Sequence, residues 1–296
     1  LSEQKLTGFL PPNRPRGWRK LFLMRLNQDI VQKVEGNQLD TREENKMWLV
    51  RHLEVIRIIM LEDLRTAKKH LVACFPPEQN IFHHCLSLYH EAVTKRILRL
   101  IEEGLEGNEF VSLLQWILQV YPSPDLLGHD SLDLEPDLIP PILSEEEVEA
   151  LVRVYLENMR SNYEMWMGNT IRQEAEDWSG EAEPELDVDN CFYTSTPVLV
   201  NRYEGRVACC VSFCNNPHFK RMIEDNLLVS KTISDSLVLK TWRLSQESLL
   251  TFGHLYREAV VTYMEIESTN FIKYSVAIIN NTKKFIAVFK VNIGHI

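Results

Sequence analysis

The sequence of 296 residues predicts an all-α protein, an elongated rod of stacked antiparallel helical bundles. Apolar residues recur at three- and four-residue steps in nearly every ordered segment, and this spacing gathers side chains on one face of an α-helix. The chain has only 11 glycines and few clusters of turn residues. It also contains no hairpin pattern of two alternating runs joined by a tight turn. Together these observations favour helices over sheets.

The most strongly marked helix lies within residues 39–77. Thr41 and Glu44 form a capping-box pattern, which predicts that the helix begins there. Pro76 and Pro77 predict its end, because the residue before a proline is disfavoured in the α conformation. The charged stripe opposite the apolar face is interrupted by apolar residues, so the helix should have more than one neighbour in a stack of bundles. The predicted apolar face comprises Leu49, Leu53, Ile56, Met60, Leu64, Ala67 and Leu71.

Further helices are predicted on both sides of this one. Pro77 suits the first position of a helix, because that position needs no backbone N–H. Asn108 is a candidate cap, and Ser144 with Glu147 forms another capping box. We expect helices at about 17–34, 77–101, 108–121, 144–178, 222–267 and 270–290.

The chain divides into three parts on this pattern. Residues 1–121 form a first helical bundle with a proline-rich lead-in, residues 122–143 an acidic proline-rich loop, and residues 144–296 a second bundle. Residues 201–221 interrupt the second bundle, since they lack helical spacing and contain three of the six cysteines. Their glycine and their Asn-Asn-Pro run predict an irregular, poorly packed insert.

Charge is distributed unevenly along the chain. The net charge of −10 combines +6 over residues 1–101, −20 over 102–190 and +4 over 191–296. An acidic middle disfavours nucleic acid as a partner, because nucleic acid requires a cationic footprint. The six cysteines have no regular spacing, which fits a reducing compartment, and no apolar run reaches the roughly 20 residues of a transmembrane helix. The sequence therefore predicts a cytosolic protein.

No catalytic pattern is found in the sequence. Phosphate-binding glycine loops, the GxSxG elbow and the HExxH helix are all absent. Carboxylate pairs are frequent, but they fall at loop edges and at helix N-termini, where they complement the helix dipole. We predict that the protein is not an enzyme and binds no cofactor.

Two groups of histidines and cysteines suggest zinc. Structural zinc normally uses paired Cys/His knuckles at short loop spacing, which neither group has. We interpret the first group as surface histidines beside a core cysteine, and the adjacent cysteines of the second as poor tetrahedral ligands, so no metal is predicted. The first group is His83, His84, Cys85 and His90 with Cys74 nearby, and the second is Cys209, Cys210, Cys214 and His218.

Arg14, Arg16, Arg19 and Lys20 form one compact basic cluster, interleaved with prolines and Trp18. Clustered basic residues near a membrane gain about 1 kcal/mol each from anionic lipid, so the cluster is a candidate contact for anionic lipid or for an acidic peptide. The alternative is a hinge whose arginines pair with neighbouring helices. Four charges are at the lower limit of the lipid-binding range, which favours the hinge.

Six collinear segments between Thr7 and Lys290 resemble exocyst complex component 3 and its paralogues. The resemblance implies a rod of stacked helical bundles without enzymatic activity. It also implies vesicle tethering at the plasma membrane in exocytosis, through other exocyst subunits and SNARE proteins, with peripheral contact to an anionic membrane. The segments are TGFLPPNRPRGWRK, VEGNQLDTREENKMWLVRHLE, CFPP, the pair Tyr89-His90, NEFVSLLQWIL and YSVAIINN.

Two other functions remain open under this resemblance. One is a component 3-like paralogue acting in membrane remodelling, and the other is a generic helical scaffold without a role in trafficking. The chain begins in the middle of the family pattern and ends on VNIGHI, where the family would continue. We therefore expect a fragment with a non-homologous insert at 201–221. Its expected location is cytoplasmic and peripheral at the plasma membrane.

Overall fold

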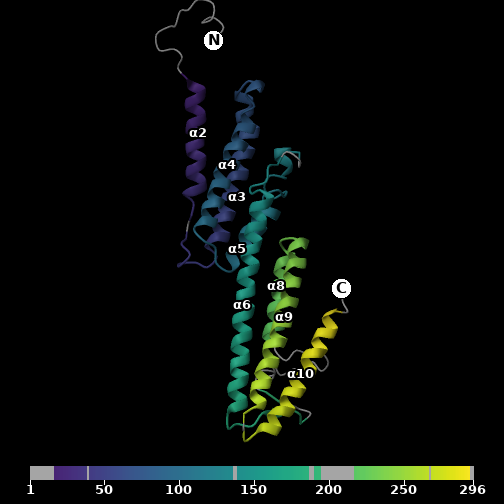
Figure 1. The fold of residues 1–296 in the computed structure, drawn as a ribbon. Helices are drawn as coiled ribbons and strands as arrows, with labels where there is room; N and C mark the ends of the chain where they lie inside the picture. Colours follow the sequence, from purple (N-terminus) through teal and green to yellow (C-terminus); the bar gives the residue numbers. More distant parts are fainter. Residues whose placement is uncertain are drawn as a thin grey trace, which may run out of the picture. The chain divides into compact units, whose positions relative to one another are not determined.

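The computed structural model describes residues 17–38, 40–135, 139–186, 190–194, 217–266 and 268–293. Within these ranges the ordered elements are helices, apart from one antiparallel pair of two-residue strands, β1 (Glu185–Leu186) and β2 (Phe192–Tyr193). The predicted all-α class is therefore confirmed. Figure 1 shows the helices, and the contacts divide the chain into two compact units, Leu1–Glu149 and Ala150–Ile296.

The first unit is built around α3 (Trp48–Thr66). The helices α2 (Trp18–Glu35) and α4 (Ile81–Glu102) both lie against it, and α5 (Asn108–Gln115) packs on it as well. Short turns continue or join these helices. They are π-helical at Ala67–Leu71 and Trp116–Val120 and 3-10-helical at Val72–Cys74, Pro77–Gln79 and Asp130–Leu132.

Side-chain contacts show that α2, α3 and α4 alternate in direction. Lys33 near the end of α2 contacts Asp63 near the end of α3, whereas Phe22 near the start of α2 lies 5.3 Å from the ring of Phe75, beyond α3. Tyr89 of α4 donates to the same Asp63. The first unit is thus an antiparallel bundle, as the sequence predicts.

The predicted apolar face of α3 lies in the core of this unit. Leu64 and Met60 are fully buried, and each such side chain contributes about 1.5–3 kcal/mol relative to an exposed one. Six of the seven residues predicted for this face are buried, and Leu71 is half-buried in the π-helical turn. The buried six are Leu49, Leu53, Ile56, Met60, Leu64 and Ala67.

The predicted start of this helix is wrong, although the capping contacts exist. The N–H and hydroxyl of Thr41 both donate to Glu44 Oε2 at 3.0 Å, yet they close a turn, and α3 begins only at Trp48. The predicted stop holds, since Phe75 is extended with φ −122° and ψ 148° immediately before Pro76. The helix starts late because the contacts of Arg42 hold this turn against α5.

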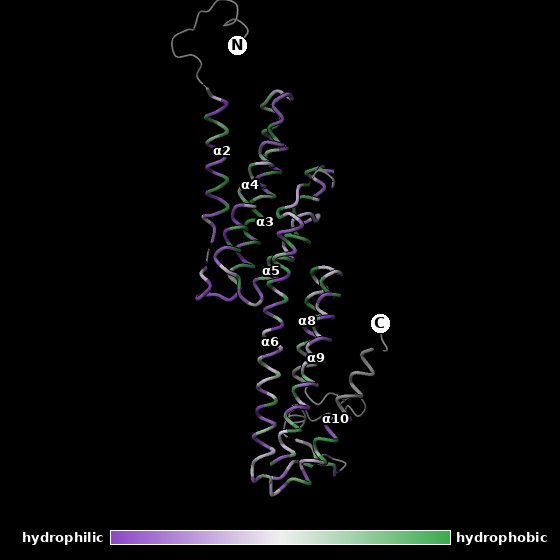
Figure 2. Tube along the Cα trace, viewed as in Figure 1, coloured by the Kyte–Doolittle hydropathy of each residue, from purple (hydrophilic) through white to green (hydrophobic). Residues whose placement is uncertain are grey.

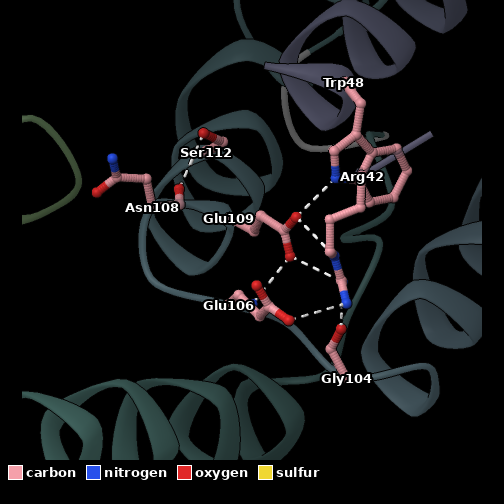
Figure 3. A network of polar contacts seen from close by, with 7 residues as sticks. All are labelled: Arg42, Trp48, Gly104, Glu106, Asn108, Glu109 and Ser112. Atoms are coloured by element: carbon pink, nitrogen blue, oxygen red, sulfur yellow. Dashed lines mark hydrogen bonds and ion pairs between the residues drawn. The ribbon is translucent and has the colours of Figure 1, made fainter. Parts of the chain in front are cut away.

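Arg42, Trp48 and Glu109 form a buried polar network (Figure 3). Arg42 Nε and Nη2 donate to the two carboxylate oxygens of Glu109 at 3.0 and 2.8 Å, and Trp48 Nε1 donates to the same carboxylate at 2.6 Å. The N–H of Glu106 donates to it at 2.9 Å, and Arg42 Nη2 also reaches the carbonyl of Gly104 at 2.6 Å. Four donors thus compensate the charge of a carboxylate that is only 7% exposed.

His52 of α3 joins a second buried network. Arg96 Nε donates to His52 Nε2 at 3.1 Å, so this nitrogen carries no proton and the neutral ring is protonated at Nδ1. Arg96 also donates to Gln38 Oε1 at 2.9 Å and lies 3.6 Å from a carboxylate oxygen of Glu103. Burial, followed by the charge of Arg96, lowers the pKa of His52 to about 4.

Two other helix starts in this unit differ slightly from prediction. Asn80, with φ 47°, separates the turn Pro77–Gln79 from α4, so the predicted single helix is divided there. The residue before α5 is Gly107 rather than Asn108, and its φ of 40° is one that glycine adopts without strain. Asn108 is therefore the first residue of the helix and not its cap.

The second unit contains most of α6 (Glu145–Ser179), together with α8 (Pro217–Lys231), α9 (Asp235–Met264) and α10 (Phe271–Ile293). The capping box predicted for α6 is present. The N–H of Ser144 donates to Glu147 Oε2 at 2.7 Å, and the N–H of Glu147 donates to Ser144 Oγ at 3.3 Å. The predicted extent of this helix, 144–178, is confirmed.

The helix predicted at 222–267 is two helices, α8 and α9. Ser234 lies between them in an extended conformation and accepts a hydrogen bond from the N–H of Leu237 at 3.2 Å, which caps α9. Ser234 and Leu237 lie in a segment whose apolar residues otherwise have helical spacing. The boundary between α8 and α9 is therefore not visible in the hydrophobic pattern.

The predicted insert at 201–221 is wrong for its last five residues. Residues 217–221 are the first turn of α8, and Pro217 is compatible with that place because the first turn needs no N–H donor. The remaining part, 201–216, lies outside the described residues.

An aromatic cluster forms the core of the second unit. Trp178 of α6 is fully buried, its ring lies 5.4 Å from that of Tyr263, and the ring of Tyr256 meets it edge-on at 5.7 Å. Tyr274 and Ile278 of α10 complete the cluster. Edge-on and offset contacts of this kind add to the free energy of burial.

Hydrophilic and hydrophobic residues alternate along the helices of both units (Figure 2). In the part of the chain that the structure describes, no helix is both long and apolar enough to cross a membrane.

Replacing Glu109 with Gln should destabilise the first unit by about 3 kcal/mol, since a buried ion pair that loses one partner leaves a charge uncompensated. The new NH2 group would face the guanidinium of Arg42 and the N–H of Glu106, which are donors themselves. Urea unfolding followed by circular dichroism measures the change. The matched control is Glu106→Gln. The carboxylate of Glu106 is exposed and lies 3.5 Å from Arg42, so this substitution should lower the unfolding free energy by less than about 1 kcal/mol. Equal losses in both variants would contradict the network.

Replacing His52 with Gln should make the fold less sensitive to acid. The folded pKa of about 4 lies below the ordinary 6.5, so the unfolded chain takes up the proton first, and stability falls as the pH drops between these values. Through this group the natural protein should lose about 3 kcal/mol of unfolding free energy over that interval. The variant should lose none of it, because Gln offers Arg96 an acceptor that does not titrate.

Urea unfolding near pH 7 and near pH 4 checks this expectation. His83→Gln serves as the control, because His83 is exposed and its replacement should leave the acid sensitivity unchanged. If His52→Gln loses as much stability at low pH as the natural protein, the buried neutral histidine is not the acid-sensitive group.

Candidate interaction surface

The structure describes two of the four basic residues predicted as a contact site. Arg19 and Lys20 are exposed in the first turn of α2, which follows Gly17 at φ 62°, whereas Arg14 and Arg16 lie outside the described residues. Within the described ranges, neither Arg19 nor Lys20 makes an ion pair with a neighbouring helix.

Exposed apolar residues surround these two cations, and sequence reasoning missed them. Trp18 is 67% exposed, Leu21 48% and Met24 49%. Other positions of α2 do the packing, with Ile30 buried and Phe22 against Phe75. Apolar residues on more than one side of the predicted helix are the sequence signal that could have revealed this exposed face.

The contact between Phe22 and Phe75 brings a second segment to this end of the first unit. Several residues within six positions of Phe75 along the chain are exposed as well, among them Lys69, which adds a further cation. Glu78 is an exposed acidic residue in the same stretch. We name the following exposed residues the end patch: Trp18, Arg19, Lys20, Leu21, Lys69, His70 and Val72.

A groove of about 690 Å³ lies between α2 and the helices α3 and α4. Ile30 and Leu71 contribute apolar walls, and the π-helical turn Ala67–Leu71 forms part of one side. Turns of this kind occur frequently at functional sites. The groove is also lined by Leu26, Asp29, Gln32, Lys33, Gly36, Asn37, Asp63, Thr66, His70, Cys74, Cys85 and Tyr89.

Three of the polar groups in the groove are paired with one another. Lys33 and Tyr89 both donate to Asp63 Oδ2. Burial, and then the hydrogen bond to Asp63, raises the pKa of Tyr89 far above its usual value, so its hydroxyl remains a donor. Burial also raises the pKa of Cys85, which keeps the thiol protonated and unreactive. Neither Tyr89 nor Cys85 is therefore prepared to act as a nucleophile in this groove.

The first predicted histidine and cysteine group is dispersed around α4. Cys85 is buried and His83 exposed, as interpreted from the sequence, while His90 Nδ1 lies 2.8 Å from the hydroxyl of Tyr121. Cys74 is exposed and donates to the carbonyl of His70 at 3.4 Å. Among the described residues, no three His, Cys, Asp or Glu side chains gather as ligands for a metal ion.

Most of the second predicted group lies outside the described residues. Cys209, Cys210 and Cys214 are outside the described residues, and His218 belongs to the first turn of α8.

A buried polar cluster in the second unit was not predicted either. Glu174 of α6 is 3% exposed and accepts from Trp178 Nε1 at 3.0 Å and from Thr194 Oγ1 at 2.5 Å. Asn281 of α10 donates to the same Thr194 oxygen at 2.8 Å, and Asn280 donates to the carbonyl of Phe192 at 3.1 Å. These contacts hold the strand pair against α6 and α10. The buried carboxylate of Glu174 therefore has a structural role.

Known proteins are similar to this chain over almost its whole length. Exocyst complex component 3 from Drosophila melanogaster is 34% identical over 97% of the chain, and the chain spans 37% of that relative. The exocyst complex component 3-like protein from Danio rerio is 24% identical over 92% of the chain, which spans 33% of it. The chain thus covers about a third of the length of these relatives.

A solved structure supports the fold. The crystal structure of M-Sec matches with a TM-score of 0.70 at 16% identity, covering 98% of this chain and 48% of that one. The family model described as exocyst complex component Sec6 matches residues 2–294. On that match and the identity to component 3, the chain belongs to the exocyst complex component Sec6 family.

Proposed function

We propose that this chain is part of an exocyst-type tethering subunit, which docks secretory vesicles at the plasma membrane in exocytosis. The family match across residues 2–294 carries this proposal. Its partners would be other exocyst subunits and SNARE proteins, and its place would be cytoplasmic and peripheral at the plasma membrane.

The arrangement of side chains supports binding as the mode of action. In the described part of the chain, several buried or half-buried titratable groups are engaged in structural contacts. Glu109 is paired with Arg42, Glu174 accepts from Trp178, and Asp63 accepts from Lys33 and Tyr89. None of these sets combines a free acid or base with a nucleophile, as catalysis requires. The proposed protein therefore acts by holding partners together and not by turnover.

A component 3-like protein in membrane remodelling is the second candidate. The observation against it is the lower identity, 24% to the Danio rerio protein compared with 34% to the Drosophila melanogaster component 3. A helical scaffold without a role in trafficking is the remaining alternative, and it would share the fold without the partners.

A segment exchange tests the tethering proposal. The matching third of Drosophila component 3 is replaced by this chain, and the tagged chimera is purified from cells and probed for the other exocyst subunits and for SNARE proteins. We expect the chimera to recover subunits at a level near that of the intact relative. We expect the isolated chain to recover them only weakly, because it lacks the surfaces of the other two thirds.

The relative with the matching third deleted is the first control, and the same exchange in the Danio rerio component 3-like protein is the second. A chimera that recovers no more subunit than the deletion contradicts the tethering proposal. Full recovery only in the component 3-like background would favour the second candidate.

A further inference from the structure

The helix α9 buries one side and leaves the other side open to solvent. Its buried residues, among them Leu237, Leu244 and Ser248, recur at helical spacing and pack within the second unit, where α8 lies alongside (Figure 1). The other side carries residues at steps of three and four, which stack along one line of the helix. We name these the outer row: Leu239, Arg243, Gln246, Leu250, His254, Arg257 and Val261.

Three apolar side chains of the outer row face solvent. Leu239 and Leu250 are each 60% exposed, and Val261 is 56% exposed. They follow one another at intervals of 11 residues, or about three turns, so the row is about 33 Å long. Isolated exposed apolar residues are common on protein surfaces, whereas a regular row along one helix is what a second helix packs against.

The charged residues of the outer row are basic. Arg243 and Arg257 are exposed and make no ion pair among the described residues. Glu247 lies one turn from Arg243, but it pairs with Arg160 of α6 at 3.0 Å. The row itself contains no acidic residue, and Glu258 lies beside it. The row therefore favours a partner with negative charges opposite the two arginines.

The outer row is symmetric about Leu250, and this symmetry disfavours a second copy as the partner. Arg243 and Arg257 lie seven positions before and after Leu250, and Leu239 and Val261 lie eleven positions before and after it. An antiparallel pair of α9 helices centred on Leu250 would bring Arg243 against Arg257. A parallel pair would bring each arginine against its own copy. Like charges opposed across an interface disfavour the complex.

The order of residues in the row also disfavours a bilayer surface. A helix that lies in a membrane interface has a broad apolar face with its charges on the polar side. In the outer row Arg243 and Arg257 stand between the apolar residues, so an apolar layer that covered Leu250 and its apolar neighbours would cover the arginines too. A second helix can cover both, because its own side chains can alternate in the same way.

We propose that the outer row of α9 binds an acidic amphipathic helix of a partner protein. Apolar residues of the partner, at intervals of 11, lie opposite Leu239, Leu250 and Val261. Carboxylates four residues inside the two outer apolar positions lie opposite Arg243 and Arg257. Because the row is symmetric, the partner helix can satisfy this pattern in either direction. The inference rests on the proposed tethering function, to which it adds a docking surface and the chemistry of the partner.

Two designed peptides test this pattern on the purified 296-residue chain. The acidic peptide is a fluorescent alanine-rich helix of about 27 residues, with leucine at the three apolar positions and glutamate at the two positions that face the arginines. The basic peptide has lysine in place of these glutamates. Fluorescence anisotropy should show at least about tenfold tighter binding of the acidic peptide, with a smaller difference at high salt.

Charge exchange provides the decisive variant. The double variant Arg243→Glu, Arg257→Glu should prefer the basic peptide, a gain of binding that a misfolded chain could not produce. Leu250→Ala should weaken binding of the acidic peptide about tenfold, because it removes the central apolar contact.

The matched control is Arg153→Glu, Lys231→Glu, which reverses two charges at exposed positions of the second unit outside the outer row. It should keep the peptide preference of the natural chain. Thermal unfolding of each variant verifies that the fold is intact.

Three results would overturn the proposal. One is equal binding of the two peptides by the natural chain, or an unchanged preference in the charge-exchange variant. Another is binding to phosphatidylserine vesicles that the charge-exchange variant loses, without binding of the acidic peptide, which would assign the row to a membrane. The third is dimerisation that Leu250→Ala abolishes, measured by sedimentation, which would assign the row to a second copy.

The segment exchange described above distinguishes this inference from the tethering proposal. A natural chimera that recovers exocyst subunits, together with a chain that binds neither peptide, contradicts the docking surface and leaves the tethering proposal intact. A chimera that recovers no subunit, together with the expected peptide preferences, contradicts tethering and leaves the docking surface intact. If Arg243→Glu, Arg257→Glu removes one protein from those that the chimera recovers, that protein carries the partner helix.

Discussion

The first unit depends on one constraint, which is that α3 has apolar residues on more than one side. Its face from Leu49 to Leu64 is buried, and Leu61, from the side opposite, is buried as well. A single neighbour cannot cover such a helix, so α2, α4 and α5 all pack against it. The antiparallel order of the bundle follows, because short connections let consecutive helices return along the one before.

Buried polar groups fix the relative positions of packed elements, which apolar packing alone does not determine. Arg42 and Glu109 fix where the turn before α3 lies on α5, and Arg96 fixes the pairing of α4 with His52. Apolar contacts tolerate small shifts, whereas a buried charge without its partner is costly. Glu174 plays the same part in the second unit, where it joins Trp178 and Thr194.

Two identical sequence patterns show what could be predicted and what could not. The boxes at Thr41 and at Ser144 have the same spacing, and in both the N–H and the hydroxyl of the first residue donate to the glutamate. The returning bond from the glutamate N–H to the hydroxyl oxygen forms at Ser144 and completes the box there. Only the one at Ser144 starts a helix, because Arg42 is drawn to Glu109, which lies 67 positions further along the chain. The presence of the helices and the buried face of α3 could be predicted, because both follow from the local spacing of apolar residues in the sequence. The end patch depends on contacts between distant segments, so only two of its residues could be named beforehand.

The contacts that join the strand pair to α10 in the second unit bear on how long the segment between them can be. Thr194 pairs with Asn281, which lies 87 positions away, and the carbonyl of Trp178 accepts from Ser268 across 90 positions. The loop closed by these contacts contains residues 195–216. Loop-closure entropy grows only with the logarithm of length, so doubling a loop costs about 0.6 kcal/mol. Lengthening the chain between Thr194 and Pro217 should therefore cost little free energy as long as the contacts around Trp178 are kept.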